Sequence, residues 1–299
     1  MSGLVLEDLS PWTDIGQQNP KDFAAGIVTQ SRSSFTFGMK ILKRPRREAM
    51  FAIYAFARTI DDIADGDWPM DVKRKLLDDW REEIEHLFAG NPKGPVSKAM
   101  LAPVQTFNLP KQEFLLMIEG MEMDANGPVQ GPSMDVLLEY TRRVAGTVGM
   151  LSVRIFGAQE APSTDQFALR LADAFQLTNI LRDVEEDAEI DRLYLPKDLL
   201  MKHDIPHATP REAAYHPNIK YVCADIGAIA RQDFLAARQS LKVLDPKTLR
   251  PALMMMGVYE GYLDMLERAN WDRSVIPLKM SKVSKLVRGL HYAFFKSFV

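Results

Sequence analysis

The spacing of apolar and polar residues along the chain is helical almost throughout. Apolar positions recur every three or four residues, whereas alternating runs bounded by turn pairs, which are typical of strands, are scarce. Pro and Gly mark short joints between the periodic segments, as at Gly66 and Pro69. The pattern predicts helices over residues 45–64, 71–89, 95–107, 110–124, 134–156, 164–187, 210–244, 246–269 and 277–298, with Ser133 as the N-cap of the fifth and Gly157 closing it.

No joint is long or low in complexity, and no repeat of solenoid length is present. We therefore predict one all-α domain over residues 21–299, a helical bundle, preceded by a flexible segment over residues 1–20. That segment is polar and acidic and has no basic start followed by an apolar core, so we expect no secretory signal. No run approaches the roughly 20 apolar residues that a membrane-spanning helix needs.

Composition narrows the function only slightly. Hydrophobic residues make up 46% and charged residues 26% of the 299, which is ordinary for a soluble globular protein. A net charge of −3 gives no reason to expect a nucleic-acid partner. The one cysteine, Cys223, cannot form an intramolecular disulfide, which fits the reducing cytoplasm.

A first acidic cluster ends the helix predicted over residues 45–64, in the sequence RTIDDIAD (58–65). Asp61 and Asp65 are four residues apart, so they share one helix face and repel each other unless a cation lies between them. Magnesium binds through one or two carboxylates together with substrate phosphates, and this pair suits it. A solvated acidic face is the alternative, although the strongly apolar stretch 50–56 indicates a largely buried helix.

A second acidic cluster lies in QLTNILRDVEED (176–187). Asn179, Asp183 and Asp187 are spaced i, i+4 and i+8, and successive members drift by only about 40° around a helix. Polar side chains on an otherwise apolar helix favour a polar cavity over a charged surface stripe. If the two clusters face each other across a bundle, they can hold several magnesium ions that stabilise a leaving diphosphate.

At these residues the chain resembles the squalene/phytoene synthase family. The likeness runs from about residue 25 to 280 and is carried by Ser33-Ser34-Phe35, Asp61–Asp65, Val144–Gly149, Asn179–Asp187 and Arg192–Pro196. It implies an all-α isoprenoid-synthase fold around a central cavity. It also implies two or three Mg²⁺ ions held by Asp61, Asp65, Asn179, Asp183 and Asp187.

The resemblance further implies which residues act on the substrate. Asp61, Asp65, Asp183, Asp187 and Tyr259 take the catalytic positions. The substrate-binding positions are Ser33, Ser34, Phe35, Arg58, Gln176, Asn179, Arg182 and Arg273, although matching Arg273 to a family arginine needs a gap. The proton acceptor stays open between the released diphosphate and a tyrosine.

Within the family, the likeness is closest to bacterial members that condense two farnesyl diphosphates head to head to presqualene diphosphate on the hopanoid route. Stretches 45–56 and 120–125 carry it. Arg143 stands where many squalene synthases have a tyrosine, which fits an enzyme that stops at the cyclopropyl intermediate and needs no NADPH; an exposed arginine on an ordinary helix face is the alternative. Phytoene synthesis from C20 substrates, complete NADPH-dependent squalene synthesis, a terpene cyclase and a non-catalytic prenyl-lipid or metal-binding protein also remain open.

The C-terminal segment mixes basic and apolar residues. After Asp272 no acidic residue follows, whereas Lys, Arg, Leu, Val and Phe alternate at helical spacing. Such a helix can rest on an anionic membrane surface, which would place a cytoplasmic enzyme at the inner face of the plasma membrane beside other enzymes of the route. A packed terminal helix with a charged outer face is the alternative.

Overall fold

The computed structural model of the chain describes residues 9–30, 38–127, 129–205, 209–272 and 280–295. In these ranges the regular elements are all helices, and the extended pairing is an isolated parallel bridge between Gln130 and Leu193. The prediction of an all-α fold is confirmed. None of the helices in the described ranges combines the length and apolarity needed to cross a bilayer.

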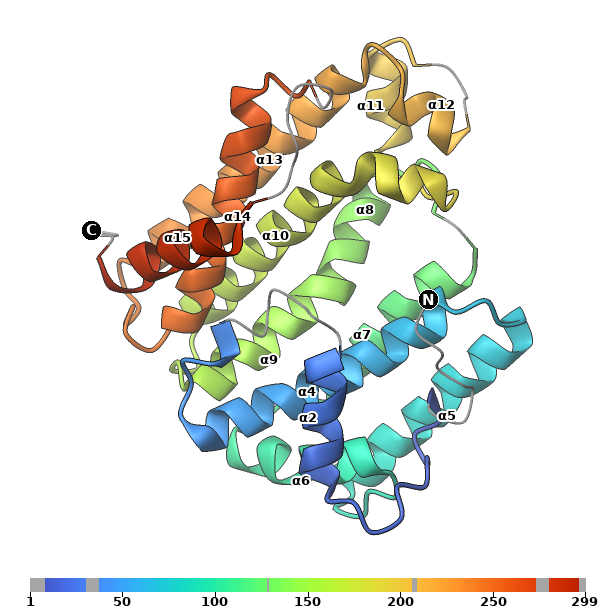
Figure 1. Cartoon of the computed structure of the whole chain (residues 1–299), viewed down its shortest axis with the longest axis vertical. Coiled ribbons are helices and arrows are strands. Elements are labelled where there is room, and N and C mark those ends of the chain that lie inside the picture. Colours follow the sequence, from blue (N-terminus) through green and yellow to red (C-terminus); the bar gives the residue numbers. More distant parts are fainter. Residues whose placement is uncertain (1–8, 31–37, 128, 206–208, 273–279, 296–299) are drawn as a thin grey trace. The chain divides into compact units, whose positions relative to one another are not determined.

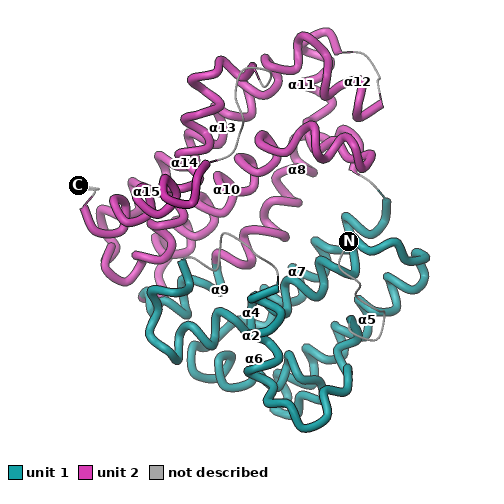
Figure 2. Tube along the Cα trace, viewed as in Figure 1, with its two compact units in different colours: residues 1–127, 150–158 teal, residues 128–149, 159–299 magenta. Residues whose placement is uncertain are grey.

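The helices form two compact units (Figure 2). Unit 1 comprises residues 1–127 and 150–158, and unit 2 comprises residues 128–149 and 159–299. The chain passes between the units three times, and one of these points, between Gly149 and Met150, falls within helix α9 (Thr147–Phe156). The first acidic cluster therefore belongs to unit 1 and the second to unit 2.

Helix α4 (Arg44–Asp65) is the centre of unit 1 (Figure 1). It contacts α2 (Pro20–Gln30), α5 (Met70–Phe88), α6 (Pro95–Thr106) and α7 (Lys111–Ala125). Its buried face packs Phe56 edge-on against Trp80 of α5 and Phe114 of α7, with ring centroids 5.4 and 5.6 Å apart. This aromatic cluster is fully buried and supports the last turns of α4, where the aspartates lie.

Part of the segment predicted to be flexible is bound to α5. The Trp12 indole donates to Glu83 Oε2 (2.9 Å), and the Trp80 indole donates to the carbonyl of Leu9 (3.0 Å). Glu83 is fully buried, and it also accepts from the backbone N–H groups of Lys93 and Gly94. A buried carboxylate needs such donors, so residues 9–12 are held in place by hydrogen bonds.

Unit 2 is built around α10 (Pro162–Glu189), the longest helix described. It contacts α8 (Met134–Thr141), α12 (Pro210–Ala214), α13 (Ile219–Ser240) and α14 (Arg250–Arg268), and α11 (Lys197–Lys202) contacts α13. Apolar residues on both sides of its polar stripe, Leu177 and Leu181 among them, are completely buried. Helix α10 is thus a core element that nevertheless carries several charged groups.

Two predicted helices are interrupted in the structure, and the two predicted over residues 246–269 and 277–298 begin later, at Arg250 and Lys282. The helix predicted over 210–244 is two helices, α12 and α13, because Pro217 lacks an N–H and disfavours helical backbone at His216. The predicted helix from Ser133 to residue 156 begins and ends as expected, but its middle is a π-helical turn, η1 (Arg142–Gly146). Such turns occur often at functional sites, and no sequence pattern used above distinguishes them from α-helix.

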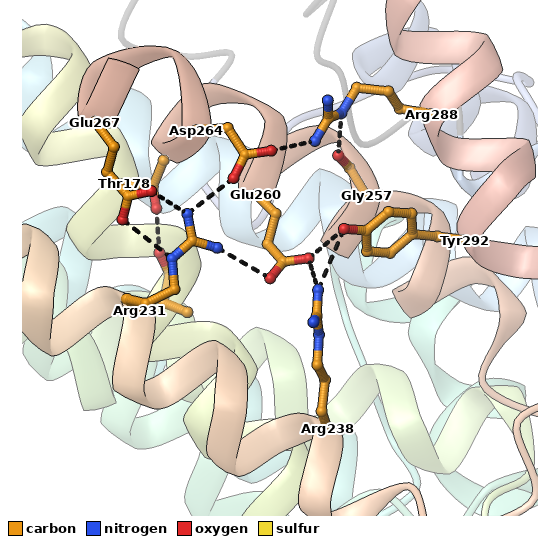
Figure 3. A network of polar contacts seen from close by, with 10 residues as sticks. Thr178, Arg231, Arg238, Gly257, Glu260, Asp264, Glu267, Arg288 and Tyr292 are labelled. Atoms are coloured by element: carbon orange, nitrogen blue, oxygen red, sulfur yellow. Dashed lines mark hydrogen bonds and ion pairs between the residues drawn. The ribbon is translucent and has the colours of Figure 1, made fainter. Parts of the chain in front are cut away.

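Helix α15 (Lys282–Phe294) packs on α14 at glycines. A Cβ added to Gly257 would lie 2.8 Å from the Arg288 carbonyl, and one added to Gly261 would lie 2.5 Å from Arg288 Nε. Figure 3 shows the polar contacts at this junction: Arg288 donates to Gly257 O (3.1 Å) and Asp264 Oδ2 (2.6 Å), and Tyr292 donates to the buried Glu260. Across α14, Arg231 of α13 donates to Asp264 (2.9 Å) and Glu267 (2.6 Å). The C-terminal helix is therefore fixed to unit 2 by close packing and by ion pairs.

Candidate functional site

The acidic end of α4 is organised by one arginine. Arg58 Nη1 donates to Asp61 Oδ2 (3.0 Å), and its Nε donates to Asp62 Oδ2 (3.1 Å) while Nη2 contacts the other oxygen of Asp62. One guanidinium thus serves two carboxylates one turn away, and Asp65 adds a further carboxylate. The cluster keeps an excess of negative charge that a cation can neutralise.

Electrostatics at Asp61 reflect this excess. Loss of hydration and the neighbouring carboxylate of Asp65 raise the pKa of Asp61 to about 7, and the charges of Asp62 and Asp124 act in the same direction against Arg58. The Asp61 side chain is still 40% exposed, so a cation from solvent can reach it. A carboxylate that is both crowded by like charge and accessible fits a metal ligand.

Asp124 of α7 was missing from the predicted site. Its side chain is buried, and its charge acts on Asp61 from a neighbouring helix of the same unit. The signal was present in the sequence, because Asp124 lies in the stretch Gly120-Met-Glu-Met-Asp124 that supports the family resemblance. Helical spacing predicts only which nearby residues share a face, so it cannot predict that two aspartates about sixty residues apart lie close together.

On α10 the arginine of the predicted stripe is paired differently from Arg58 on α4. Arg182 Nε and Nη2 both donate to Asp183, at 2.6 Å each, in a two-pronged ion pair. Asp187, one turn further on, lies near the unlike charge of Arg192 and the like charge of Asp183. Burial first, and the Asp183 carboxylate second, raise the pKa of Asp187 to about 7.

Asn179 supplies the clearest test of whether a metal fits this stripe. Its amide Nδ2 donates weakly to Gln176 Oε1 (3.5 Å), but its buried Oδ1 has no hydrogen-bond partner among the described residues. A buried carbonyl oxygen without a partner costs about 1–3 kcal/mol, so it is retained where something else binds it. With the carboxylates of Asp183 and Asp187 in line, the donor set is all oxygen, as magnesium prefers.

No three acidic, histidine or cysteine side chains of the described ranges converge closely enough to hold a metal ion by themselves. Magnesium that enters with a diphosphate needs fewer protein ligands, because the substrate supplies the remaining oxygens. The residues present fit such an ion on α4, through the carboxylates of Asp61 and Asp65, and on α10, through the oxygens of Asn179, Asp183 and Asp187.

Tyr259 lies beside the α10 stripe. Its buried ring stacks on Phe175, with centroids 4.4 Å apart, and burial raises the pKa of its hydroxyl against the effects of Arg182 and Asn179. Arg182 also lies over the ring of Tyr262 (5.3 Å). The structure thus places Gln176, Asn179, Arg182, Asp183 and Tyr259 together. The remaining predicted substrate residues, Ser33, Ser34, Phe35 and Arg273, lie outside the described residues.

A pocket in unit 2 is separate from the stripe. It is lined by Tyr215, Pro217 and Trp271, and α10 contributes only Glu185, which points to the opposite side from Asp183. It is not the central cavity that the resemblance implies, and that cavity stays a prediction.

Comparisons with known proteins agree with this picture. The squalene/phytoene synthase profile matches residues 28–285. A presqualene diphosphate synthase from Rhodopseudomonas palustris is 40% identical over 87% of this chain and 93% of its own length. A phytoene synthase from Arthrospira platensis is 32% identical over 82% of this chain and 83% of its own. A crystal structure of a dehydrosqualene synthase in complex with ligand has the same fold, with a TM-score of 0.79 at 22% identity over 91% of this chain and 95% of that one.

Proposed function

We propose that this chain, which belongs to the squalene/phytoene synthase family, is a prenyl transferase that joins two farnesyl diphosphates to presqualene diphosphate. The observation that carries the proposal is the 40% identity to a presqualene diphosphate synthase over nearly the full length of both chains, against 32% to a phytoene synthase. Substrates of this class are prenyl diphosphates. The C15 length and the endpoint of the reaction are parts of the proposal.

The proposed reaction releases one diphosphate and one proton. The C1–O bond of one farnesyl diphosphate breaks, and the 2,3 double bond of the second attacks C1. Loss of a proton closes the cyclopropane, and the second diphosphate is retained in the product. Farnesyl cations react with water, so the apolar surroundings of the stripe on α10 serve to exclude it.

The residues of the two clusters bind and orient the diphosphates in this proposal. When bound, magnesium neutralises the diphosphate and stabilises it as a leaving group. Asp61 and Asp65 would hold magnesium on α4, and Asn179, Asp183 and Asp187 would hold magnesium on α10. Arg58 and Arg182 keep their partner carboxylates in place, since Arg58 is already bound to Asp61 and Asp62, and Arg182 to Asp183.

Tyr259 is the proposed candidate for handling the released proton. Its hydroxyl is buried beside Asn179 and Arg182, and burial keeps it in its neutral form. A neutral tyrosine that takes up the proton of the reaction must release one in turn, and the released diphosphate can accept it.

An endpoint at presqualene diphosphate agrees with the position of Arg143. Its side chain is only 21% exposed, lies in the π-helical turn and pairs with Glu139 (2.6 Å). We propose that no NADPH is required.

Product analysis tests the proposal. Purified protein is incubated with farnesyl diphosphate and magnesium, with and without NADPH, and intact products are identified by mass spectrometry. We expect a C30 diphosphate whose amount does not depend on NADPH, and no product when magnesium is removed by chelation.

Other products would replace the proposal. Squalene formed only with NADPH would identify a complete squalene synthase, and a cyclised C15 hydrocarbon a terpene cyclase. Consumption of geranylgeranyl but not farnesyl diphosphate would identify a phytoene synthase. Binding without consumption of either would leave a prenyl-lipid binding protein.

A further inference from the structure

Helix α15 exposes its apolar side. Val283, Val287, Leu290 and Phe294 follow the spacing i, i+4, i+7 and i+11, so they form one stripe along the helix. Their exposed fractions are 70%, 60%, 36% and 47%. Leu286 extends the stripe on one side, and Phe295, 78% exposed, lies just beyond the helix.

The polar side of the same helix faces its neighbour. Arg288 is bound to Asp264 and to the Gly257 carbonyl, and Tyr292 is bound to Glu260 (Figure 3). Lys285 lies over the ring of Tyr262, 5.4 Å from its centroid. In a terminal helix that merely covers a core the apolar side packs inward, so this helix has the reverse orientation.

The α14–α15 contacts fix that orientation. Gly257, Gly261 and Gly289 let the two helices approach closely, and rotation of α15 would break the ion pair between Arg288 and Asp264. Leaving six large apolar side chains in water costs free energy, and such patches mark sites of interaction. The stripe is therefore held outward by specific contacts.

We propose that this stripe binds the surface of an anionic lipid bilayer. The six residues Val283, Leu286, Val287, Leu290, Phe294 and Phe295 enter the boundary between headgroups and acyl chains. Charge complementarity identifies the occupant: the sequence after Asp272 holds only basic charges, and Lys282 and His291 are exposed at the edges of the stripe. A helix of 13 residues, about 20 Å long, lies along the membrane plane in this mode.

A dimer interface formed by α15 of two copies would explain the exposed apolar residues but not the basic ones. Two copies that meet through α15 would bring like charges together, since this segment has no acid to pair with Lys282 of the other copy. An anionic surface satisfies the apolar and the basic groups together.

Vesicle sedimentation tests the proposal without using the catalytic activity. The full chain is mixed with vesicles of phosphatidylcholine alone or with phosphatidylglycerol, and the bound fraction is measured. We expect binding to the anionic vesicles that weakens with salt. Val287→Glu should lower the partition coefficient at least about tenfold. The matched control is Val243→Glu, which adds the same charge at a valine that is 75% exposed after α13, and it should bind as wild type does.

Two results would overturn the proposal. Equal vesicle binding by Val287→Glu and wild type would remove the stripe from the interaction. A lipid-free dimer in sedimentation velocity that Val287→Glu converts to monomer would assign the stripe to a second copy. Turnover of dispersed substrate should stay within about twofold in Val287→Glu, so failure here is distinct from failure of the proposed reaction.

Discussion

The two acidic clusters reach a similar electrostatic state by different routes. On α4, Arg58 donates to both Asp61 and Asp62, whereas on α10 Arg182 makes a two-pronged ion pair with Asp183. In each cluster one carboxyl, Asp61 or Asp187, has its pKa raised to about 7 by burial and by the next aspartate on its face. In both units burial and an aspartate four residues away together outweigh the lowering effect of the nearby arginine on the pKa.

The clusters differ in their neutral ligands. The α10 stripe contains Asn179, whose carbonyl oxygen has no partner in the described part of the chain, and the ring of Tyr259 lies close by. The α4 cluster has no amide in its motif and instead gains the buried carboxylate of Asp124. We infer that cations would reduce the repulsion between carboxylates in both clusters. On α10 they would in addition bind the buried Asn179 carbonyl oxygen.

Removal of a carboxylate that we propose as a metal ligand should have the largest effect. Asp61→Ala and Asp183→Ala should each fold and lower kcat/KM by at least about a hundredfold, because metal that holds the leaving group can supply several kcal/mol. The measurement is steady-state turnover of farnesyl diphosphate at saturating magnesium, with circular dichroism to confirm folding.

Asp78→Ala is the matched control for this loss. Asp78 is 71% exposed and pairs with Arg81 on the surface of unit 1. Its loss should leave turnover within about twofold of wild type, as is usual for surface positions. Wild-type activity in Asp61→Ala would remove α4 from the metal site, and in Asp183→Ala would remove α10.

Asn179→Leu should have a smaller effect on activity and little effect on the stability of the metal-free protein. It removes a buried carbonyl without a partner, so the metal-free protein should not be destabilised by more than about 1 kcal/mol. Turnover should fall about tenfold, since one oxygen ligand of several is lost. In thermal melts, magnesium with diphosphate should raise the Tm of wild type by several degrees and that of Asn179→Leu by much less.

A contrasting variant sharpens this result. Thr178→Val changes the adjacent buried residue, whose hydroxyl donates to the Ala174 carbonyl (2.6 Å) within the helix. It should lower stability while the ligand-induced shift in Tm stays as in wild type. If magnesium with diphosphate raises the Tm of Asn179→Leu as much as that of wild type, Asn179 Oδ1 is not a metal ligand.

Much of this arrangement follows from the sequence, because it depends on short-range geometry. The spacing of Asp61 and Asp65, and of Asn179, Asp183 and Asp187, settles which side chains share a face once the segments are helical. Both helices form as predicted within two residues at each end. The apolar pattern of each helix was sufficient to predict that the helix is buried and which of its sides carries the polar residues.

Features that depend on contacts between distant residues were beyond such reasoning. The approach of Asp124 to Asp61 and the choice of Asp183 as the partner of Arg182 follow from packing. The same holds for the reversed orientation of α15, where the apolar period was visible but the face that packs inward is decided by three glycines and by Asp264 and Glu260. The break at Pro217 could have been read from the sequence, since proline inside a helical pattern signals it.

The smallest effect concerns stability against pH in the metal-free protein. The Asp61 carboxyl keeps its proton up to about pH 7 when folded but only to about pH 3.8 when unfolded, so the folded state binds more protons between these values. Its contribution to the free energy of unfolding is therefore present below pH 3.8 and is lost as the pH rises to about 7. Because the side chain is 40% exposed, we discount the loss to about 1 kcal/mol, or roughly 2–4 °C in Tm.

Asp61→Asn should flatten this decline. Asp187→Asn should flatten a decline of the same sign that Asp187 causes, because its pKa is also raised to about 7, and the double variant should remove both declines. Each variant should thus melt at a higher temperature than wild type at pH 8 without metal, although each loses activity. Asp65→Asn should act on the decline caused by Asp61, and Asp183→Asn on that caused by Asp187, because each is the neighbouring like charge. If the Asp61→Asn and Asp65→Asn effects simply add, Asp65 does not perturb Asp61; if the double variant equals the larger single one, the two carboxylates share one electrostatic site that a cation relieves.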